Sequence, residues 1–164
     1  MSNTDRVRLA PGRPERRAAE TTLAMWRDAM GEGDLPRLAD IKIQYDGDGW
    51  EHRFLLIEDP NPLWSVFILC GATARLAFDG AVVGRSLEEV MLPHGQPLVD
   101  ACLAALRDRV PVQASGSFPA RGGQRLVYRA VFLPMRGDVG APRYVLGTFG
   151  WRREPASPAE EESS

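Results

Sequence analysis

The stretch from Trp64 to Met91, WSVFILCGATARLAFDGAVVGRSLEEVM, constrains the fold more than any other part of the sequence. Its beginning is almost entirely apolar, which predicts a strand that is buried on both faces. Short helical turns are expected next, interrupted by Gly80 and Gly84. Ser86 and Glu89 have the spacing of a capping box, which favours a helical turn directly after the serine. This part of the chain is therefore expected to pass from sheet to short helices.

Two longer helices are predicted on either side of this stretch. From Glu15 to Gly31, apolar residues recur every three or four positions, as in an amphipathic helix, and they are Ala19, Leu23, Trp26 and Met30. From Gly95 to Arg109 a second helix is expected, because Pro97 suits a first turn and one apolar stripe follows it. Each stripe must be covered, because a short helix alone is marginal in water.

Five strands are expected, at His52–Glu58, Trp64–Cys70, Val112–Phe118, Gln124–Pro134 and Arg143–Trp151. The first two are predicted to form a hairpin with a loop of roughly four to five residues. In the fourth strand neither set of alternating residues is cleanly polar, although Arg125 and Arg129 share one set. Both faces of the sheet are therefore expected to be covered, the second by the N-terminal helix, by a partner subunit, or by both.

Length and composition indicate a single domain. A chain of 164 residues with 44% apolar residues is long enough for one packed core. Residues 1–14 and the acidic segment 153–164 are expected to be disordered tails around a single domain at 15–152. The net charge of -2 argues against nucleic acid as a partner. The sequence has neither a signal-peptide pattern nor a membrane-spanning apolar run, so a cytoplasmic protein is expected.

Three motifs carry a resemblance to a known family. They are WRDAMGEGDLPRLADI from Trp26, CGATARLAFDGAVVGRSLEEVM from Cys70, and YRAVFLPMRGD from Tyr128 followed by YVLGTF from Tyr144. In their order and spacing, over residues 16–152, the chain resembles a PAS domain, specifically the bacterial stand-alone PAS-like proteins with an N-terminal helix. The resemblance implies an α+β fold: a five-stranded antiparallel sheet with short helices and one longer helix on one face, plus the N-terminal helix.

The resemblance also implies a sensory or regulatory role rather than an enzymatic one. Because no effector segment is recognised in the sequence, the expected output is signalling through an unidentified partner protein. A second hypothesis is a sensor in which a small apolar or mixed ligand controls dimerisation. A third is a small α+β enzyme, which would require a polar cleft with a perturbed titratable pair.

The expected ligand pocket lies between the sheet and the helices, as an apolar space with a few polar anchors. Its candidate residues are Phe67, Arg75, Phe78, Cys102, Phe118, Tyr128 and Thr148, with Ser117 as a further anchor. The alternative is a filled core, in which the aromatic residues of the strands and helices, Trp64 and Trp151 included, occupy this space.

Other candidates concern dimerisation and cofactors. Leu23, Trp26 and Met30 are interface candidates for a homodimer if their stripe meets a second copy of the chain. No cluster has metal-ligand spacing, so neither a metal nor a cofactor is expected. His94 is a candidate haem ligand, but a lone histidine in a polar loop argues against haem. Cys70 and Cys102 are expected to remain unpaired.

Overall fold

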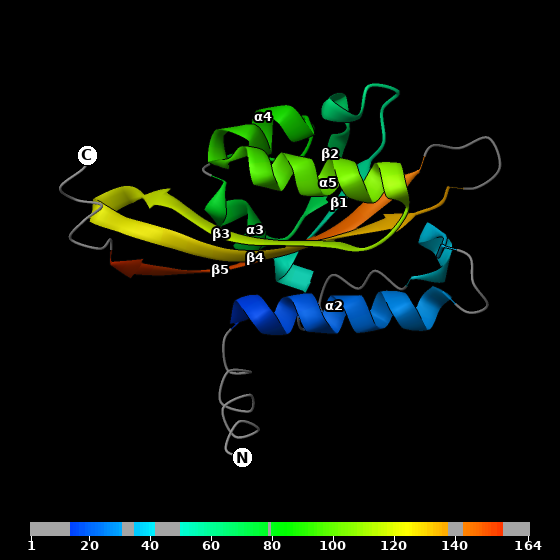
Figure 1. Cartoon of the computed structure of the whole chain (residues 1–164), viewed down its shortest axis with the longest axis horizontal. Coiled ribbons are helices and arrows are strands. Elements are labelled where there is room, and N and C mark those ends of the chain that lie inside the picture. Colours follow the sequence, from blue (N-terminus) through cyan, green and yellow to red (C-terminus); the bar gives the residue numbers. More distant parts are fainter. Residues whose placement is uncertain (1–13, 31–34, 42–49, 79, 138–142, 156–164) are drawn as a thin grey trace, which may run out of the picture.

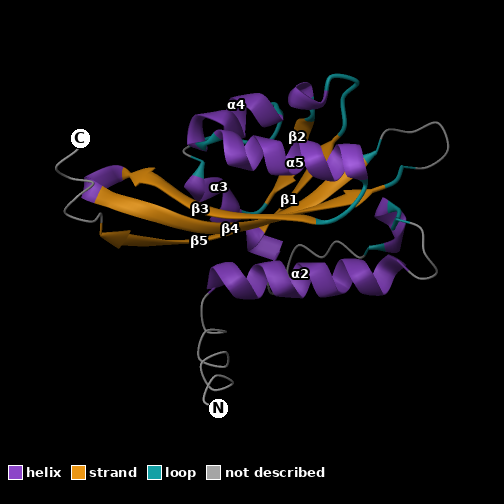
Figure 2. Cartoon of the chain, in the orientation of Figure 1, coloured by secondary structure: helices purple, strands orange, loops and turns teal. Residues whose placement is uncertain are grey.

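The structure is a computed structural model, and it describes residues 14–30, 35–41, 50–78, 80–137 and 143–155. One sheet lies between two helical layers (Figure 1). The α-helices are α2 (Pro14–Met30), α3 (Ala72–Ala77), α4 (Leu87–Met91) and α5 (Gln96–Asp108). Helices α3, α4 and α5 lie on one face of the sheet, and α2 lies across the other (Figure 2). None of the described helices is long and apolar enough to cross a membrane.

The strands are β1 (Arg53–Ile57), β2 (Val66–Cys70), β3 (Val112–Ala120), β4 (Gln124–Met135) and β5 (Tyr144–Pro155). Their order in the sheet is β2-β1-β5-β4-β3, and all neighbouring strands are antiparallel. Helices α3 to α5 belong to the connection between β2 and β3. This arrangement confirms the α+β, PAS-like fold that the sequence resemblance implied.

Short 3-10 turns complete the described chain: η2 (Leu38–Asp40), η3 (Trp50–His52), η4 (Pro62–Trp64), η5 (Leu92–His94) and η6 (Arg121–Gly123). The predicted capping box is confirmed at the start of α4. The Glu89 backbone N–H donates to Ser86 Oγ at 3.1 Å, and the Ser86 N–H donates to Glu89 Oε1, also at 3.1 Å. Two orphan donors of the first helical turn are satisfied in this way.

The β1–β2 hairpin is present, but the prediction of a strand buried on both faces is wrong. Strand β2 is the edge of the sheet, and only Phe67 among its residues is fully buried. The residues that precede it form η4, where the side chain of Asn61 accepts a hydrogen bond from the Leu63 N–H. Trp64, expected in the core, is therefore carried outward on this turn and is 58% exposed.

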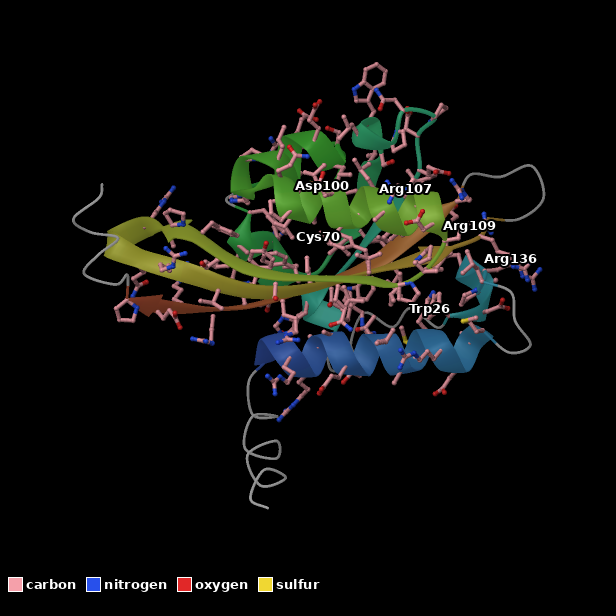
Figure 3. The ribbon with its side chains drawn as sticks, in the orientation of Figure 1. Trp26, Cys70, Asp100, Arg107, Arg109 and Arg136 are labelled. Atoms are coloured by element: carbon pink, nitrogen blue, oxygen red, sulfur yellow. The ribbon has the colours of Figure 1, made fainter. Side chains whose placement is uncertain are left out.

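The second face of the sheet is covered by the chain's own N-terminal helix. Ala19 and Trp26 of α2 pack with Leu55, Leu133 and Leu146 of the sheet in one buried cluster. The Trp26 indole Nε1 donates to the Pro134 carbonyl at 3.0 Å, and Figure 3 shows this side chain between α2 and the sheet. The sequence left open whether the N-terminal helix, a partner subunit or both cover this face of the sheet. The structure shows the N-terminal helix on it.

The ends of the domain differ from the expected boundaries by a few residues. Helix α2 begins at Pro14, and β5 continues to Pro155, so residues 153–155 of the expected acidic tail are strand. The rest of both expected tails, residues 1–13 and 156–164, lies outside the described residues.

A close approach between β1 and β5 requires glycine at position 147. Gly147 is paired with Phe54, and the Phe54 ring occupies the space above the glycine. A Cβ atom at Gly147 would lie 2.1 to 2.7 Å from three atoms of that ring. Phe54 is fully buried and also contacts Phe67 and Phe132, so its ring has little room to move.

We therefore expect Gly147→Ala to lower the free energy of unfolding by about 2–3 kcal/mol, because overpacking forces the ring or the strand to shift. Urea unfolding followed by circular dichroism measures the loss. In the double variant with Phe54→Leu, the smaller side chain makes room for the methyl group, so the loss should be smaller than the sum of the two single losses. Strict additivity of the two losses would contradict the proposed contact.

Candidate functional site

The expected ligand pocket is filled by aromatic side chains whose rings contact one another in series. Phe78 contacts Phe149 with ring centroids 4.6 Å apart, and Tyr128 stacks on the other side of the series at 5.1 Å from Phe149. Phe118 continues the series at 5.9 Å from Tyr128. These separations are those of packed aromatic pairs. Three of the predicted pocket residues thus contact each other, directly or through Phe149.

Two further pocket candidates belong to the same cluster. Phe67 packs against Phe54 at 5.4 Å between ring centroids, and Cys102 of α5 is fully buried among the same residues. The structure therefore brings five of the seven candidates together in the core between the sheet and helices α3 to α5. At these positions side chains fill the space that a ligand would need.

The remaining two candidates lie elsewhere. Arg75 is on α3 and is exposed, because the buried positions of this short helix are Ala74 and Ala77. Thr148 is buried, but it is paired with Arg53 and faces α2 rather than the helices α3 to α5. Strand register decides the face, and alternation in the sequence separates two faces without saying which one is which.

The sequence suggested that His94 lies in a polar loop, but the structure places it elsewhere. It is half-buried in η5, and its ring is 4.5 Å from the Phe118 ring and 5.5 Å from the Phe78 ring between centroids. Its surroundings are those of an aromatic residue at the edge of the core. Within the described ranges, no group of three or more His, Cys, Asp and Glu side chains is placed to hold a metal ion.

Both cysteines are free thiols. Burial raises the pKa of the Cys70 thiol to about 11, although the nearby Arg75 charge acts in the opposite direction. Burial alone raises the pKa of the Cys102 thiol, which is completely enclosed. Because the thiolate is the reactive form, neither side chain has the character of a nucleophile or a redox centre.

The interface candidates on α2 face the chain's own sheet. Trp26 is fully covered there, and Leu23 and Met30 are half-buried against the same cluster. The apolar stripe of α2 is thus covered by the sheet of the same copy of the chain. The sequence favoured a dimer only if this stripe met a second copy of the chain, and here the chain's own sheet covers it. The oligomeric state stays a prediction.

An open groove that the sequence did not indicate lies between η4 and the C-terminal half of α5. It has a volume of about 500 Å³, and Pro62, Leu63, Leu103 and Leu106 form its apolar lining. We call it the apolar groove. The sequence did not indicate it because Pro62 and Leu63 were expected in the hairpin loop and Trp64 at the start of a strand, rather than all three in a 3-10 turn. Trp64 directly follows Leu63 and presents one of the most exposed large apolar side chains of the described chain.

The charges around the apolar groove are neutralised in pairs. Arg143 Nε donates to Glu58 Oε1 at 2.7 Å, and a second contact joins Arg143 Nη2 to Glu58 Oε2. Arg107, at the C-terminal end of α5 in Figure 3, donates from Nε to Asp108 Oδ1 at 2.9 Å. The hydrogen bond to Glu58 raises the pKa of Arg143, and the one to Asp108 raises the pKa of Arg107. The groove therefore presents an apolar surface with no net charge at its rim.

The thiol environment gives a testable expectation. At pH 8, Cys70 should react with iodoacetamide about a hundredfold more slowly than a peptide thiol of ordinary pKa, because its thiolate is correspondingly rarer. The rate should then rise about tenfold per pH unit towards pH 11. Mass spectrometry of the modified peptide separates Cys70 from Cys102. A rate at pH 8 equal to that of the peptide thiol would contradict the assigned environment.

Comparison with known proteins gives matches among solved structures. No protein-family model matches the chain, and no curated protein matches it. The structure of an RNA-binding light-oxygen-voltage receptor is similar with a TM-score of 0.44 and 16% identity, over 68% of this chain and 33% of the receptor chain. This chain therefore spans about a third of that receptor's length. The PAS domain of BvgS from Bordetella pertussis is similar with a TM-score of 0.36 and 18% identity, over 71% of this chain and 84% of that one.

Proposed function

We propose that this chain is a regulatory domain of PAS-like fold that acts by binding a partner protein in the apolar groove. The observation that carries the proposal is the groove itself, with an apolar lining, a neutralised rim and an exposed Trp64 that directly follows the lining residue Leu63. Exposed apolar surface of this kind costs free energy in a soluble domain, so its retention favours an interaction site.

The filled core supports partner binding over the small-ligand sensor. Five of the seven expected ligand contacts are closely packed with other side chains, as the aromatic separations of 4.6 to 5.9 Å illustrate. A ligand at these positions would have to displace rings that are already in contact. The apolar groove needs no such rearrangement.

The character of the groove defines its occupant. Since Glu58 and Arg107 already have partners of opposite charge, a charged ligand gains little there. The fitting occupant is a short segment of another protein that presents apolar side chains. Trp64 would add a large contact surface at the edge, and tryptophan is among the residues that most often dominate interface energies.

We expect Trp64→Ala to reduce recovery of a specific partner about tenfold or more, the effect of removing an interface anchor. Affinity capture with the full chain from cells that express it, quantified by mass spectrometry, measures the recovery. Leu76→Ala is the matched control, because Leu76 is a large apolar side chain on α3 that is 65% exposed and, unlike Trp64, does not adjoin a groove-lining residue in the chain.

Both substitutions are on the surface and should change the free energy of unfolding by no more than about 0.5 kcal/mol. The proposal requires a protein that the unmodified chain and Leu76→Ala both recover and that Trp64→Ala loses. Equal recovery of every protein by all three forms would refute it. A small molecule found in the core by native mass spectrometry would favour the sensor hypothesis instead.

A further inference from the structure

The face of the sheet that α2 covers changes character along its length. Towards the C-terminal end of α2 the face is apolar and closed by Trp26. In the other direction β3, β4 and β5 project beyond the N-terminal end of α2 (Figure 1). There the strands and the first turn of α2 enclose a groove of about 380 Å³. We call it the arginine groove, and its polar side chains are those of Arg16, Ser115, Ser117, Arg129 and Arg152.

Strand register accounts for this convergence. Ser115 is paired with Arg129 across β3 and β4, and Arg152 of β5 is paired with Val127 of β4. Paired residues project to the same face, and alternate residues of one strand share a face. Arg129 is also paired with Gly150, which has no side chain to fill the space beside the guanidinium. Three strands and one helix thus contribute to one hollow.

The arginine groove carries an excess of positive charge. Among the described residues, neither Arg16 nor Arg129 has an ion-pair partner. Arg152, by contrast, is paired, because its Nη1 contacts Glu154 Oε2. The guanidinium groups of Arg16 and Arg129 therefore line one groove without an ion-pair partner among the described residues, and that of Arg152 lines it with them. Their mutual repulsion is weakest when an anion lies between them.

A second observation lies further along β5 on the same face. Thr148 lies on the same face of β5 as Arg152 and Gly150, further towards the interior of the domain. Its Oγ1 is buried without a hydrogen-bond partner among the described residues. It is paired with Arg53, whose Nε donates to Thr22 Oγ1 at 2.8 Å. Burial lowers the pKa of the Arg53 guanidinium, and no described carboxylate pairs with it. Positive charge thus continues beneath α2 without compensation.

We propose that the arginine groove binds a phosphate-bearing small molecule. Guanidinium groups match the geometry of phosphate oxygens through paired N–H donors, and hydroxyl groups such as that of Ser115 supply further hydrogen bonds. The positive end of the α2 dipole adds to the attraction, because Arg16 lies in the first turn of a helix of 17 residues. The volume of about 380 Å³ falls in the range of small-molecule sites and exceeds what a lone phosphate ion needs.

This site goes beyond the proposed partner binding. The arginine groove is on the α2 face, whereas the apolar groove is formed by η4 and α5 on the opposite face. A ligand held by Arg16 and Arg129 would join α2 to β4. The structure therefore assigns separate places to a small anionic ligand and to a protein partner.

Isothermal titration of the full chain with inorganic pyrophosphate tests the site, at an ionic strength of about 0.01 M so that screening is weak. We expect Arg129→Gln and Arg16→Gln each to raise the Kd at least about tenfold, because each removes a charged hydrogen-bond donor. Arg75→Gln is the matched control: Arg75 is an exposed arginine of α3 outside this groove, and its loss should leave the Kd unchanged.

Several outcomes would overturn the assignment. They are the absence of binding by the unmodified chain, an equal effect of Arg75→Gln and Arg129→Gln, and citrate binding as tightly as pyrophosphate, since citrate offers carboxylates of similar total charge. Circular dichroism shows whether each variant is folded, and Arg16→Gln provides an independent measurement if Arg129→Gln is not. Trp64→Ala should bind pyrophosphate normally, so failure here is distinguishable from failure of the partner proposal.

Discussion

The pairing of β1 with β5 is the interaction on which the rest of the structure depends. It inserts the C-terminal strand between β1 and β4, so the two hairpin-like parts of the chain become one sheet. The insertion requires Gly147, because the Phe54 ring occupies the place of any side chain there. Phe54 in turn contacts Phe67 and Phe132, which links the edge of the sheet to its centre. A contact between residues so distant in sequence forms only after a large loss of chain entropy.

Central placement of β5 also determines which surfaces remain for function. A central strand has two buried faces, and here helices α3 to α5 cover one while α2 covers the other. The apolar stripe of α2 and the aromatic rings of the core are both buried by this packing. Two surfaces that this packing does not use are the apolar groove between η4 and α5 and the arginine groove beyond the N-terminal end of α2. Both grooves are therefore available to bind other molecules without disturbing the core.

Local patterns predicted the elements well, and non-local geometry accounts for the errors. Apolar spacing predicted α2 and α5 to within one or two residues, and the capping box predicted α4. The placements of Trp64 and Thr148 failed for a shared reason: whether β2 is an edge and which face Thr148 takes both depend on strand order and register. An alternating pattern is unchanged when its two faces are exchanged. Five pocket candidates, four aromatic residues and Cys102, lie in one core cluster, as apolar residues of one core are expected to do, and their role as ligand contacts stays a prediction.

The arginine groove had a weak signal in the sequence, since Arg125 and Arg129 alternate with apolar residues on the face of β4 that α2 covers only in part. That Arg129 lines one groove together with Arg16 and Arg152 depends on the strand register, which the sequence does not specify. Like charges held together oppose folding, and a buried Arg53 without a described carboxylate adds to that cost. An anion bound in the groove would offset the repulsion in the folded state alone, so ligand binding and the stability of the α2 face are coupled. The same coupling would allow a small ligand to control how firmly α2 is held on the sheet.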